Sequence, residues 1–381
     1  MTHMTHSFTN ARLVLPENVI TGSLEVKGGT ISAIDEGGIP AHGHDCEGDF
    51  LIPGLVELHT DHLEIHYSPR PKVRWNPVSA VQAHDAQIAC AGITTVFDAL
   101  RVGMDAEAEL NVDDMRALAG AIESAQAEKR LRAEHFIHLR CEVSAPDVMS
   151  AYEHFKNDAH VRLMSLMDHT PGQRQFVSIE MYRVYYQTKK NFTDEQMEAY
   201  IAMRQAVADK NAPQHRKLLA DSARERGILL ASHDDATVAH VDEAISLGTG
   251  IAEFPTTLEA ARASHAAGMG VLMGGPNVVR GGSHSGNISA KALAEDGCLD
   301  IISSDYVPVS MLQAAFHLAG DVEGVSLPQA MAMVTATPAK MAGLADRGRL
   351  ETGLRADLVQ VRLVGNVPVV RGVWREGRRV A

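Results

Sequence analysis

The feature that most constrains the fold of this chain is a series of eight short apolar runs, separated by longer stretches of helical character. The runs are almost continuously apolar, as expected of strands that are buried on both faces of a parallel sheet. Alternating strands and helices form βαβ units, and eight such units close into a TIM-type (β/α)8 barrel. The runs are Leu55–Thr60, Thr94–Ala99, His135–Cys141, Val161–Met167, Ile228–Ser232, Gly250–Phe254, Gly270–Met273 and Leu299–Ser303.

Helical stretches lie between these runs, for example Val112–Lys129, Met197–Asp209 and Leu258–Ala267. The gap of roughly 60 residues between the fourth and fifth runs is longer than one barrel unit requires. We expect that gap to hold additional helix.

Both ends of the chain have a different, β-rich pattern. Short β-like runs and turn residues fill residues 1 to about 50 and return after Ala339. We therefore predict an α/β chain with a barrel at residues 53–339 and one small β domain formed jointly by residues 1–52 and 340–381. The terminal runs are Ser7–Leu15, Leu24–Val26, Thr30–Ile34, Gly348–Leu350, Leu358–Val361, Val367–Val370 and Val373–Trp374.

The composition of the chain indicates its cellular location and excludes some classes of binding partner. No run approaches the ~18 apolar residues of a membrane span, and the N-terminus lacks the apolar region of a signal peptide. The four cysteines are scattered, which favours reduced thiols and a cytoplasmic location. The net charge of −13 argues against nucleic acid or an anionic membrane as partner, but not against a small anionic substrate. A homo-oligomer is compatible with the sequence, although nothing in the chain demonstrates one.

Acids and histidines close six of the eight predicted strands. The carboxyl ends of barrel strands share one rim, where TIM-barrel enzymes carry their active sites. A single histidine there would more often be structural, but several histidines and carboxylates together predict a metal site. The strand-end residues are His59 and Asp61, Asp98, Glu142, Asp168 and His169, His233 to Asp235, and Asp305.

The mixture of imidazole and carboxylate donors favours Zn or Mn, with Fe as a further candidate. Six ligands are too many for one tetrahedral ion but suit two ions ~3.5–4 Å apart. Two such ions would activate water at neutral pH, which predicts metal-assisted hydrolysis. Glu142 is the candidate bridge, Asp305 also handles the proton of the water, and Glu57 supports the ligands. The six predicted ligands are His59, Asp61, Glu142, His169, His233 and Asp305.

Cationic residues follow several of the same strands, which is unexpected in an acidic chain. We expect them to bind an anionic substrate, although solvated loop charges are the ordinary alternative for any one of them. The Gly-rich segment Gly274–Asn287 can direct backbone N–H groups at phosphate. Four further polar residues, His62, His66, His84 and Asp85, are either supports for ligands or ordinary polar residues. The predicted substrate-binding residues are Arg70, Lys72, Arg74, Arg101, Arg174, Arg280, His284 and Asn287.

Over essentially its whole length the chain resembles the amidohydrolase superfamily. The stretch PGLVELHTD is similar to the first-strand motif of that superfamily, and Thr337–Val361 to the segment that re-enters its small β domain. Asp61 replaces the second histidine of the usual His-x-His motif. Glu142 replaces a carboxylated lysine, as in the sugar-deacetylase branch. His169, His233 and Asp305 match the remaining metal residues, although by our strand count the two histidines lie one strand earlier than usual.

Several unusual blocks resemble one phosphonate-degrading branch of that superfamily. The resemblance implies hydrolysis of alpha-D-ribose 1-methylphosphonate 5-triphosphate to the 5-phosphate, with release of pyrophosphate and with two divalent metal ions as cofactors. The blocks include SPRPKVRW, AHDAQIACAGITTVFDAL, HLRCEVS, MDHTPGQRQF and MGGPNVVRGGSHSGNISA.

Two alternatives remain open at this stage. An amidohydrolase or deaminase acting on a C–N bond could use the same metal site, but it would not need so many rim cations. A barrel that had lost catalysis and become a scaffold would lose metal ligands first, whereas all six are present here.

Overall fold

The barrel predicted from the sequence is present. The computed structural model describes residues 5–37, 43–104, 109–174, 179–180, 183, 192–283 and 286–381. Each of the eight predicted runs coincides with a strand, with ends that differ by at most a few residues. The strands are β6 (Leu55–Thr60), β7 (Ile93–Val102), β8 (Glu134–Glu142), β9 (Val161–Met167), β10 (Leu229–His233), β11 (Ile251–Glu253), β12 (Gly270–Gly274) and β13 (Ile301–Ser303).

These strands form one eight-stranded sheet in sequence order, from β6 to β13. The first and last strands of that order are joined by a parallel bridge between Thr60 and Asp305, so the sheet closes on itself. All six residues of β6 are buried, as a strand covered on both faces requires. The α/β barrel class is therefore confirmed. The fourth strand ends at Met167 as predicted, and the fifth ends at His233, one residue later than predicted.

Helices alternate with the strands. The long gap between β9 and β10 contains the 33-residue helix α6, which begins with a capping box formed by Thr193 and Gln196 and ends at the left-handed Gly227. The helices are α1 (Leu63–Tyr67), α2 (Pro77–Cys90), α3 (Val112–Ala127), α4 (Val148–Glu153), α6 (Asp194–Arg226), α7 (Val238–Leu247), α8 (Leu258–Ala266), α9 (Gly275–Val279), α10 (Ala290–Glu295), α11 (Ser310–Asp321), α12 (Leu327–Ala332) and α13 (Ala336–Met341).

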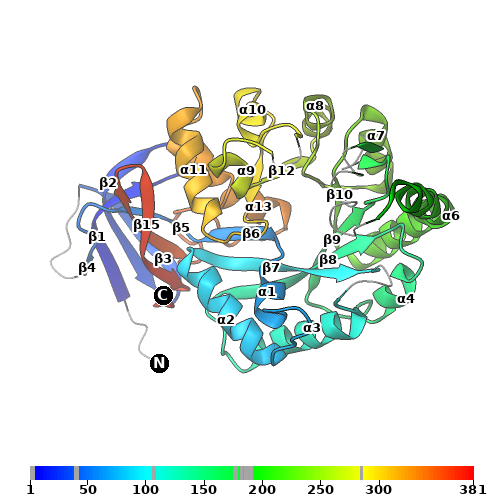
Figure 1. Cartoon of the computed structure of the whole chain (residues 1–381). Coiled ribbons are helices and arrows are strands. Elements are labelled where there is room, and N and C mark those ends of the chain that lie inside the picture. Colours follow the sequence, from blue (N-terminus) through cyan, green and yellow to red (C-terminus); the bar gives the residue numbers. More distant parts are fainter. Residues whose placement is uncertain are drawn as a thin grey trace. The chain divides into compact units, whose positions relative to one another are not determined.

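The two ends of the chain build a second sheet together, as predicted (Figure 1). Its order is β16-β15-β14-β5-β1-β2-β3, with β4 beside β1. Strand β5 joins the two segments, because it pairs in parallel with β1 and antiparallel with β14. The strands are β1 (Thr5–Val14), β2 (Val19–Lys27), β3 (Thr30–Glu36), β4 (His44–Asp45), β5 (Phe50–Pro53), β14 (Leu358–Val364), β15 (Val367–Arg375) and β16 (Arg378–Arg379).

Apolar residues from both ends of the chain pack on this sheet. Phe8 of β1 meets Trp374 of β15 edge to face, with their ring centroids 4.9 Å apart. Two sequence predictions were wrong in detail here. Gly348–Leu350 is not a strand; Gly348 has a φ of +89°, and Leu350 is a buried member of the same apolar cluster. The two predicted runs in Val367–Trp374 are the single strand β15.

The chain divides into two compact units. The first consists of Met1–Asp98, Ala121–Phe136 and Met273–Ala381, and therefore contains the terminal sheet. The second consists of Ala99–Gly120 and Ile137–Leu272. The domain boundaries expected near residues 52 and 340 stay a prediction.

Gly54 shows why a glycine precedes the first barrel strand. A Cβ atom at this position would lie 2.1 Å from Oγ1 of Thr94, so any larger residue would push β6 away from the start of β7.

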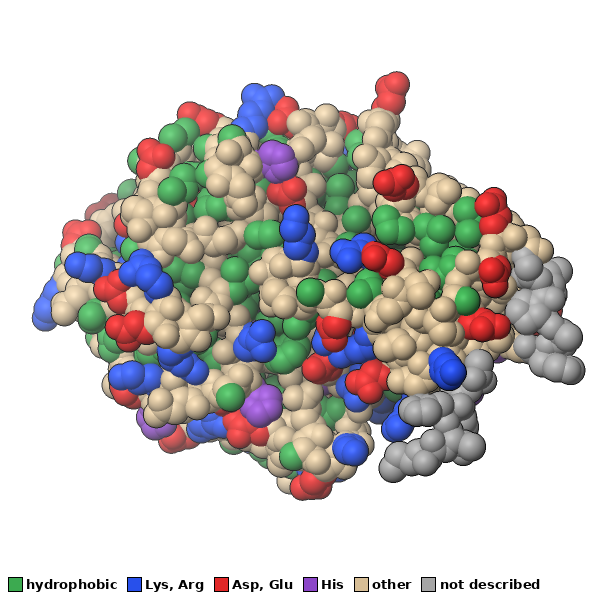
Figure 2. Space-filling view, turned by 180° about the vertical axis from the view of Figure 1, so that it is seen from behind, with side chains coloured by type: hydrophobic (Ala, Val, Ile, Leu, Met, Phe, Trp, Pro, Cys, Tyr) green, Lys and Arg blue, Asp and Glu red, His purple; other side chains and the backbone are tan. Residues whose placement is uncertain are grey.

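The surface carries charges of both signs. On the face shown in Figure 2, Lys and Arg side chains lie interspersed with Asp and Glu side chains. Among the described residues, no helix is both long enough and apolar enough to cross a membrane. All four cysteines are free, as the sequence suggested.

An ion cluster within the first unit provides a test of stability. Glu134 Oε2 accepts hydrogen bonds from Nη1 of Arg347 at 2.6 Å and from Nη1 of Arg355 at 2.5 Å. Because Arg347 is only 6% exposed, Glu134→Ala removes a charged acceptor from a buried guanidinium. That guanidinium then keeps its contacts with Asp346 and Thr95. We expect this variant to lower the free energy of unfolding by about 2 kcal/mol, measured by urea denaturation.

Glu351→Ala is the matched control. Its carboxylate pairs with Arg349 at 2.9 Å, but both side chains are well exposed, so we expect a loss of less than about 0.5 kcal/mol. Equal losses in the two variants would contradict the importance of burial at Glu134.

Candidate metal centre

The predicted ligands of the first unit form one convergent group at the point where the barrel sheet closes. Ligand atoms of His59, Asp61 and Asp305 all lie within 4.8 Å of one another. The backbone fixes this arrangement, because the N–H of Asp61 donates to the carbonyl of Asp305 at 2.9 Å and the N–H of Asp305 donates to the carbonyl of His59 at 3.1 Å. Asp305 also has a φ of +56°, a strained conformation typical of functional positions.

Glu57 supports this group through hydrogen bonds to the backbone, as its position two residues before His59 on the strand predicted. It is fully buried, and its carboxylate accepts a 2.6 Å hydrogen bond from the N–H of His59 and another from the N–H of Ser304. Burial raises the pKa of Glu57 to about 7, although these hydrogen bonds oppose the shift. Glu57 therefore connects the ends of β6 and β13 rather than facing a ligand.

A second convergent group lies in the second unit. Ligand atoms of His169, His233 and Asp234 lie within 4.8 Å of one another. The sequence analysis counted Asp234 among the strand-end residues but not among the six predicted ligands. Oδ2 of Asp234 is 3.5 Å from Nε2 of His233 and 3.8 Å from Nε2 of His169. This oxygen is buried and has no hydrogen-bond partner among the described residues. Asp234 has a φ of +57°, which turns the chain sharply after β10.

Carboxylates hold the rear nitrogen of each histidine in this group. Oε2 of Glu142 lies 2.6 Å from Nδ1 of His169, and Oε2 of Glu253 lies 3.0 Å from Nδ1 of His233. An ionised carboxylate can only accept, so in both rings Nδ1 carries the proton and Nε2 carries the lone pair. Both lone pairs are thus on the nitrogen nearer to Asp234.

Glu142 and His169 also shift each other's pKa. Burial alone would raise the pKa of Glu142, but the adjacent imidazole and three hydrogen bonds hold it below its ordinary value. The hydroxyl of Ser144 donates one of these bonds at 2.5 Å. Burial lowers the pKa of His169, but Glu142 more than offsets this effect and raises it overall. The bridging role predicted for Glu142 stays a prediction.

Glu253 belongs to a fully buried polar chain that sequence analysis missed. Its Oε2 accepts a 2.6 Å hydrogen bond from the hydroxyl of Ser165, and that hydroxyl also contacts Nε2 of His138. The sequence signal for this chain was the position of Glu253 within the apolar run Gly250–Phe254. An unpaired charge buried at such a position is energetically costly, so Glu253 needs a partner.

Both groups suit a divalent metal ion. Each combines imidazole and carboxylate donors, and in the second group an unpartnered carboxylate oxygen faces two imidazole lone pairs. This donor set fits Zn, Mn or Fe rather than Mg or Ca. The structure thus brings together the predicted ligands His59, Asp61 and Asp305 in one unit, and Glu142, His169 and His233 in the other.

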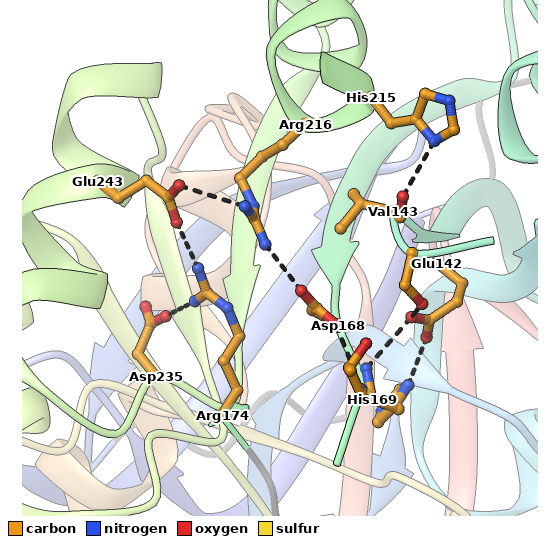
Figure 3. Close-up of polar contacts among 11 residues, drawn as sticks. Glu142, Val143, Asp168, His169, Arg174, His215, Arg216, Asp235 and Glu243 are labelled. Carbon is orange, nitrogen blue, oxygen red and sulfur yellow. Dashed lines mark hydrogen bonds and ion pairs between the residues drawn. The ribbon is translucent and has the colours of Figure 1, made fainter. Parts of the chain in front are cut away.

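A network of alternating acids and arginines lies next to the loops that carry the second group (Figure 3). Arg216 bridges Asp168 and Glu243, with both contacts at 3.2 Å. Arg174 bridges Glu243, at 2.6 Å, and Asp235. Because Asp168 adjoins His169 and Asp235 adjoins Asp234, the network ties together the two loops that carry the second group.

A pocket of about 550 Å³ lies against this network. Arg174 and Arg216 line it, but so do the carboxylates of Asp168, Asp209 and Glu243. The lining carboxylates outnumber the guanidinium groups, so this pocket is poorly suited to a polyphosphate.

The other predicted substrate-binding residues are distributed over both units. Those of the first unit are the exposed Arg70, Lys72 and Arg280 and the half-buried Arg74 and Asn287, whereas Arg101 and the buried Arg174 belong to the second. His284 lies outside the described residues. In the Gly-rich segment, residues 275–279 form α9, and a Cβ on Gly275 would lie 2.6 Å from Oγ of Ser310. This glycine therefore serves close packing on α11.

Comparison with known proteins identifies relatives of the whole chain. The profile of the Amidohydrolase family matches residues 86–381. The alpha-D-ribose 1-methylphosphonate 5-triphosphate diphosphatase of Escherichia coli (strain K12) is 48% identical over 374 residues, which cover 97% of this chain and 99% of the relative.

Solved structures with the same fold are more distant. A 5-methylcytosine deaminase from Klebsiella pneumoniae superimposes with a TM-score of 0.65 at 16% identity, covering 98% of both chains. An N-acetylglucosamine-6-phosphate deacetylase from Pasteurella multocida gives a TM-score of 0.60 at 14% identity, covering 99% of both chains. At these identities the likeness concerns the fold.

The hydrogen bond behind His233 yields a test. Glu253→Gln keeps the size of the side chain but removes the charge that fixes the Nδ1 proton. We expect the affinity for Zn²⁺ to fall about 10- to 100-fold, measured by competition with a chromophoric chelator. Glu259→Gln, at an exposed position on α8, should leave the affinity unchanged. An unaltered affinity in Glu253→Gln would show that His233 is not a ligand.

Proposed function

Because this chain belongs to the amidohydrolase family, we propose that it is a metal-dependent hydrolase that cleaves alpha-D-ribose 1-methylphosphonate 5-triphosphate to the 5-phosphate and pyrophosphate. The observation that carries this proposal is the 48% sequence identity, over 97% of this chain, to a diphosphatase named for that substrate. The substrate is a small anionic phosphorylated sugar. With four free cysteines, we assign the reaction to the cytoplasm.

We assign two divalent ions, Zn or Mn with Fe as a further candidate, to the six residues predicted from the sequence. When bound, such ions supply a Lewis acid and lower the pKa of water to near neutrality. The assignment is supported by the convergence of His59, Asp61 and Asp305 in one group and of His169 and His233 in the other. Both groups come from the carboxyl ends of strands, where TIM-barrel enzymes carry their active sites. Asp234 is a further candidate ligand of the second group.

Asp305 is the residue that we assign to the proton of the attacking water. Hydrolysis adds water at the phosphorus attached to ribose O5 and breaks the bond to the bridging oxygen of the departing pyrophosphate. A carboxylate that accepts the proton must be held rigidly beside the ligands. The two backbone hydrogen bonds of Asp305 to the end of β6 provide that rigidity.

The departing pyrophosphate needs cations to stabilise its charge. We assign this role to Arg70, Lys72, Arg74, Arg101 and Arg280, with Asn287 and His284 as further contacts. Arg74 is partly preorganised, because its Nη1 donates to the hydroxyl of Ser68 at 3.2 Å. Arg174 is less suited to this role, since Asp235 and Glu243 already compensate its charge.

Release of pyrophosphate from the 5-triphosphate is the direct test. We expect the purified protein to release one pyrophosphate per substrate, to lose this activity after treatment with a chelator, and to recover it with Zn²⁺ or Mn²⁺. Asp305→Asn should lower kcat by at least about 10²-fold, the lower end of what general acid–base catalysis contributes. An enzyme-coupled pyrophosphate assay measures both effects.

Asp321→Asn is the matched control, because Asp321 is an exposed acid on α11 that pairs with the solvent-accessible His317. It should retain full activity. Cleavage of C–N substrates without pyrophosphate release would contradict the proposal in favour of an amidohydrolase or deaminase. A failure to bind any metal after supplementation would favour a non-catalytic scaffold.

A further inference from the structure

Three histidines outside the proposed ligand set converge in the first unit. One ring nitrogen from each of His62, His66 and His84 lies within 4.8 Å of the others. His62 and His66 come from the start and the last turn of α1, and His84 comes from α2, which packs beside it (Figure 1). From the sequence alone, these three histidines could either support metal ligands or be ordinary polar residues.

The spacing of the cluster matches that of metal ligands. His62 has helical backbone angles, so His62 and His66 are an i, i+4 pair on one face of a single helical turn, with their ring centroids 4.9 Å apart. Nδ1 of His62 lies 3.2 Å from Nδ1 of His84. Two imidazole nitrogens on one tetrahedral Zn²⁺ lie roughly 3.3–3.4 Å apart, given Zn–N bonds of ~2.0–2.1 Å.

A buried carboxylate orients His84. Nε2 of His84 lies 2.7 Å from Oδ1 of Asp98, and the other oxygen of Asp98 lies 2.7 Å from Nδ1 of His135. Because the carboxylate accepts, Nε2 of His84 carries the proton and Nδ1 presents its lone pair to His62. A histidine that donates its rear N–H to a carboxylate is the usual arrangement behind a metal ligand.

The third ring nitrogen of the cluster belongs to His66. Its Nε2 is buried and has no hydrogen-bond partner among the described residues. Imidazole binds a metal through the lone pair of a ring nitrogen, so a buried ring nitrogen without a hydrogen-bond partner suits a ligand position.

We propose that His62, His66 and His84 form a zinc site distinct from the ligands assigned to hydrolysis, with its fourth position open to water. Three imidazoles favour Zn²⁺ over the hard cations Mg²⁺ and Ca²⁺. The ion would cross-link α1 to α2 and so stiffen the segment directly after β6, the strand whose carboxyl end is flanked by His59 and Asp61. This inference does not depend on the proposed reaction.

Counting bound zinc tests the site without reference to activity. His169→Ala/His233→Ala removes two ligands assigned to hydrolysis and is the background variant. Adding His66→Ala to that background should remove one further zinc ion per chain, measured by elemental analysis after dialysis at buffered low free zinc. Adding His317→Ala, a solvent-accessible histidine on α11, should remove none. Equal zinc content with and without His66 would overturn the proposal and leave a metal-free hydrogen-bonded histidine cluster.

A cysteine variant keeps the test decisive if His66→Ala folds poorly. His66→Cys retains a zinc ligand, so the zinc content of the background should be preserved. With Co²⁺ in place of zinc, this variant should gain a thiolate-to-cobalt charge-transfer band in the near ultraviolet, which the parent with histidine lacks. A cobalt-loaded variant without that band would place residue 66 outside the coordination sphere and overturn the proposal.

Discussion

The structure depends most on the pair of backbone hydrogen bonds that closes the barrel sheet. Asp61 donates to the carbonyl of Asp305, and Asp305 donates to the carbonyl of His59. The buried carboxylate of Glu57 adds two further hydrogen bonds at this closure, because it accepts from the N–H groups of His59 and Ser304. The same few bonds therefore join the first and last strands and bring three candidate ligand side chains together. The contacts that close the sheet also position the first candidate ligand group.

Three of the histidines in the convergent groups are held by a buried carboxylate. Glu142 holds His169, Glu253 holds His233, and Asp98 holds His84, in each case at one ring nitrogen. Each carboxylate fixes the tautomer and leaves the opposite nitrogen with a lone pair. Burial would make such charges costly if they were alone, so the histidine and its carboxylate stabilise each other. These three histidines and their carboxylates therefore occur as stabilising pairs.

The sequence predicted the barrel because its strands are buried on both faces and read as uninterrupted apolar runs. It failed at Gly348–Leu350, where a β-like composition stands at a turn with a left-handed glycine. The ligand group of the first unit followed from strand alternation and strand ends. Asp234 could not be separated from Asp235 by sequence, since only the φ of +57° decides which carboxylate turns toward the histidines. Arg174 looked like a free rim cation because its partners, Asp235 and Glu243, are distant in sequence.

The left-handed backbone at Asp234 and Asp305 limits how this protein can vary. Among residues with a side chain, Asp and Asn occupy that conformation at the lowest cost, because their short polar groups bond locally. A change from Asp to Asn needs only one base in the codon and preserves the turn. At either position, a single base change to Asn would therefore remove the carboxylate charge while the fold stays intact. Selection there acts on charge, with the backbone held constant.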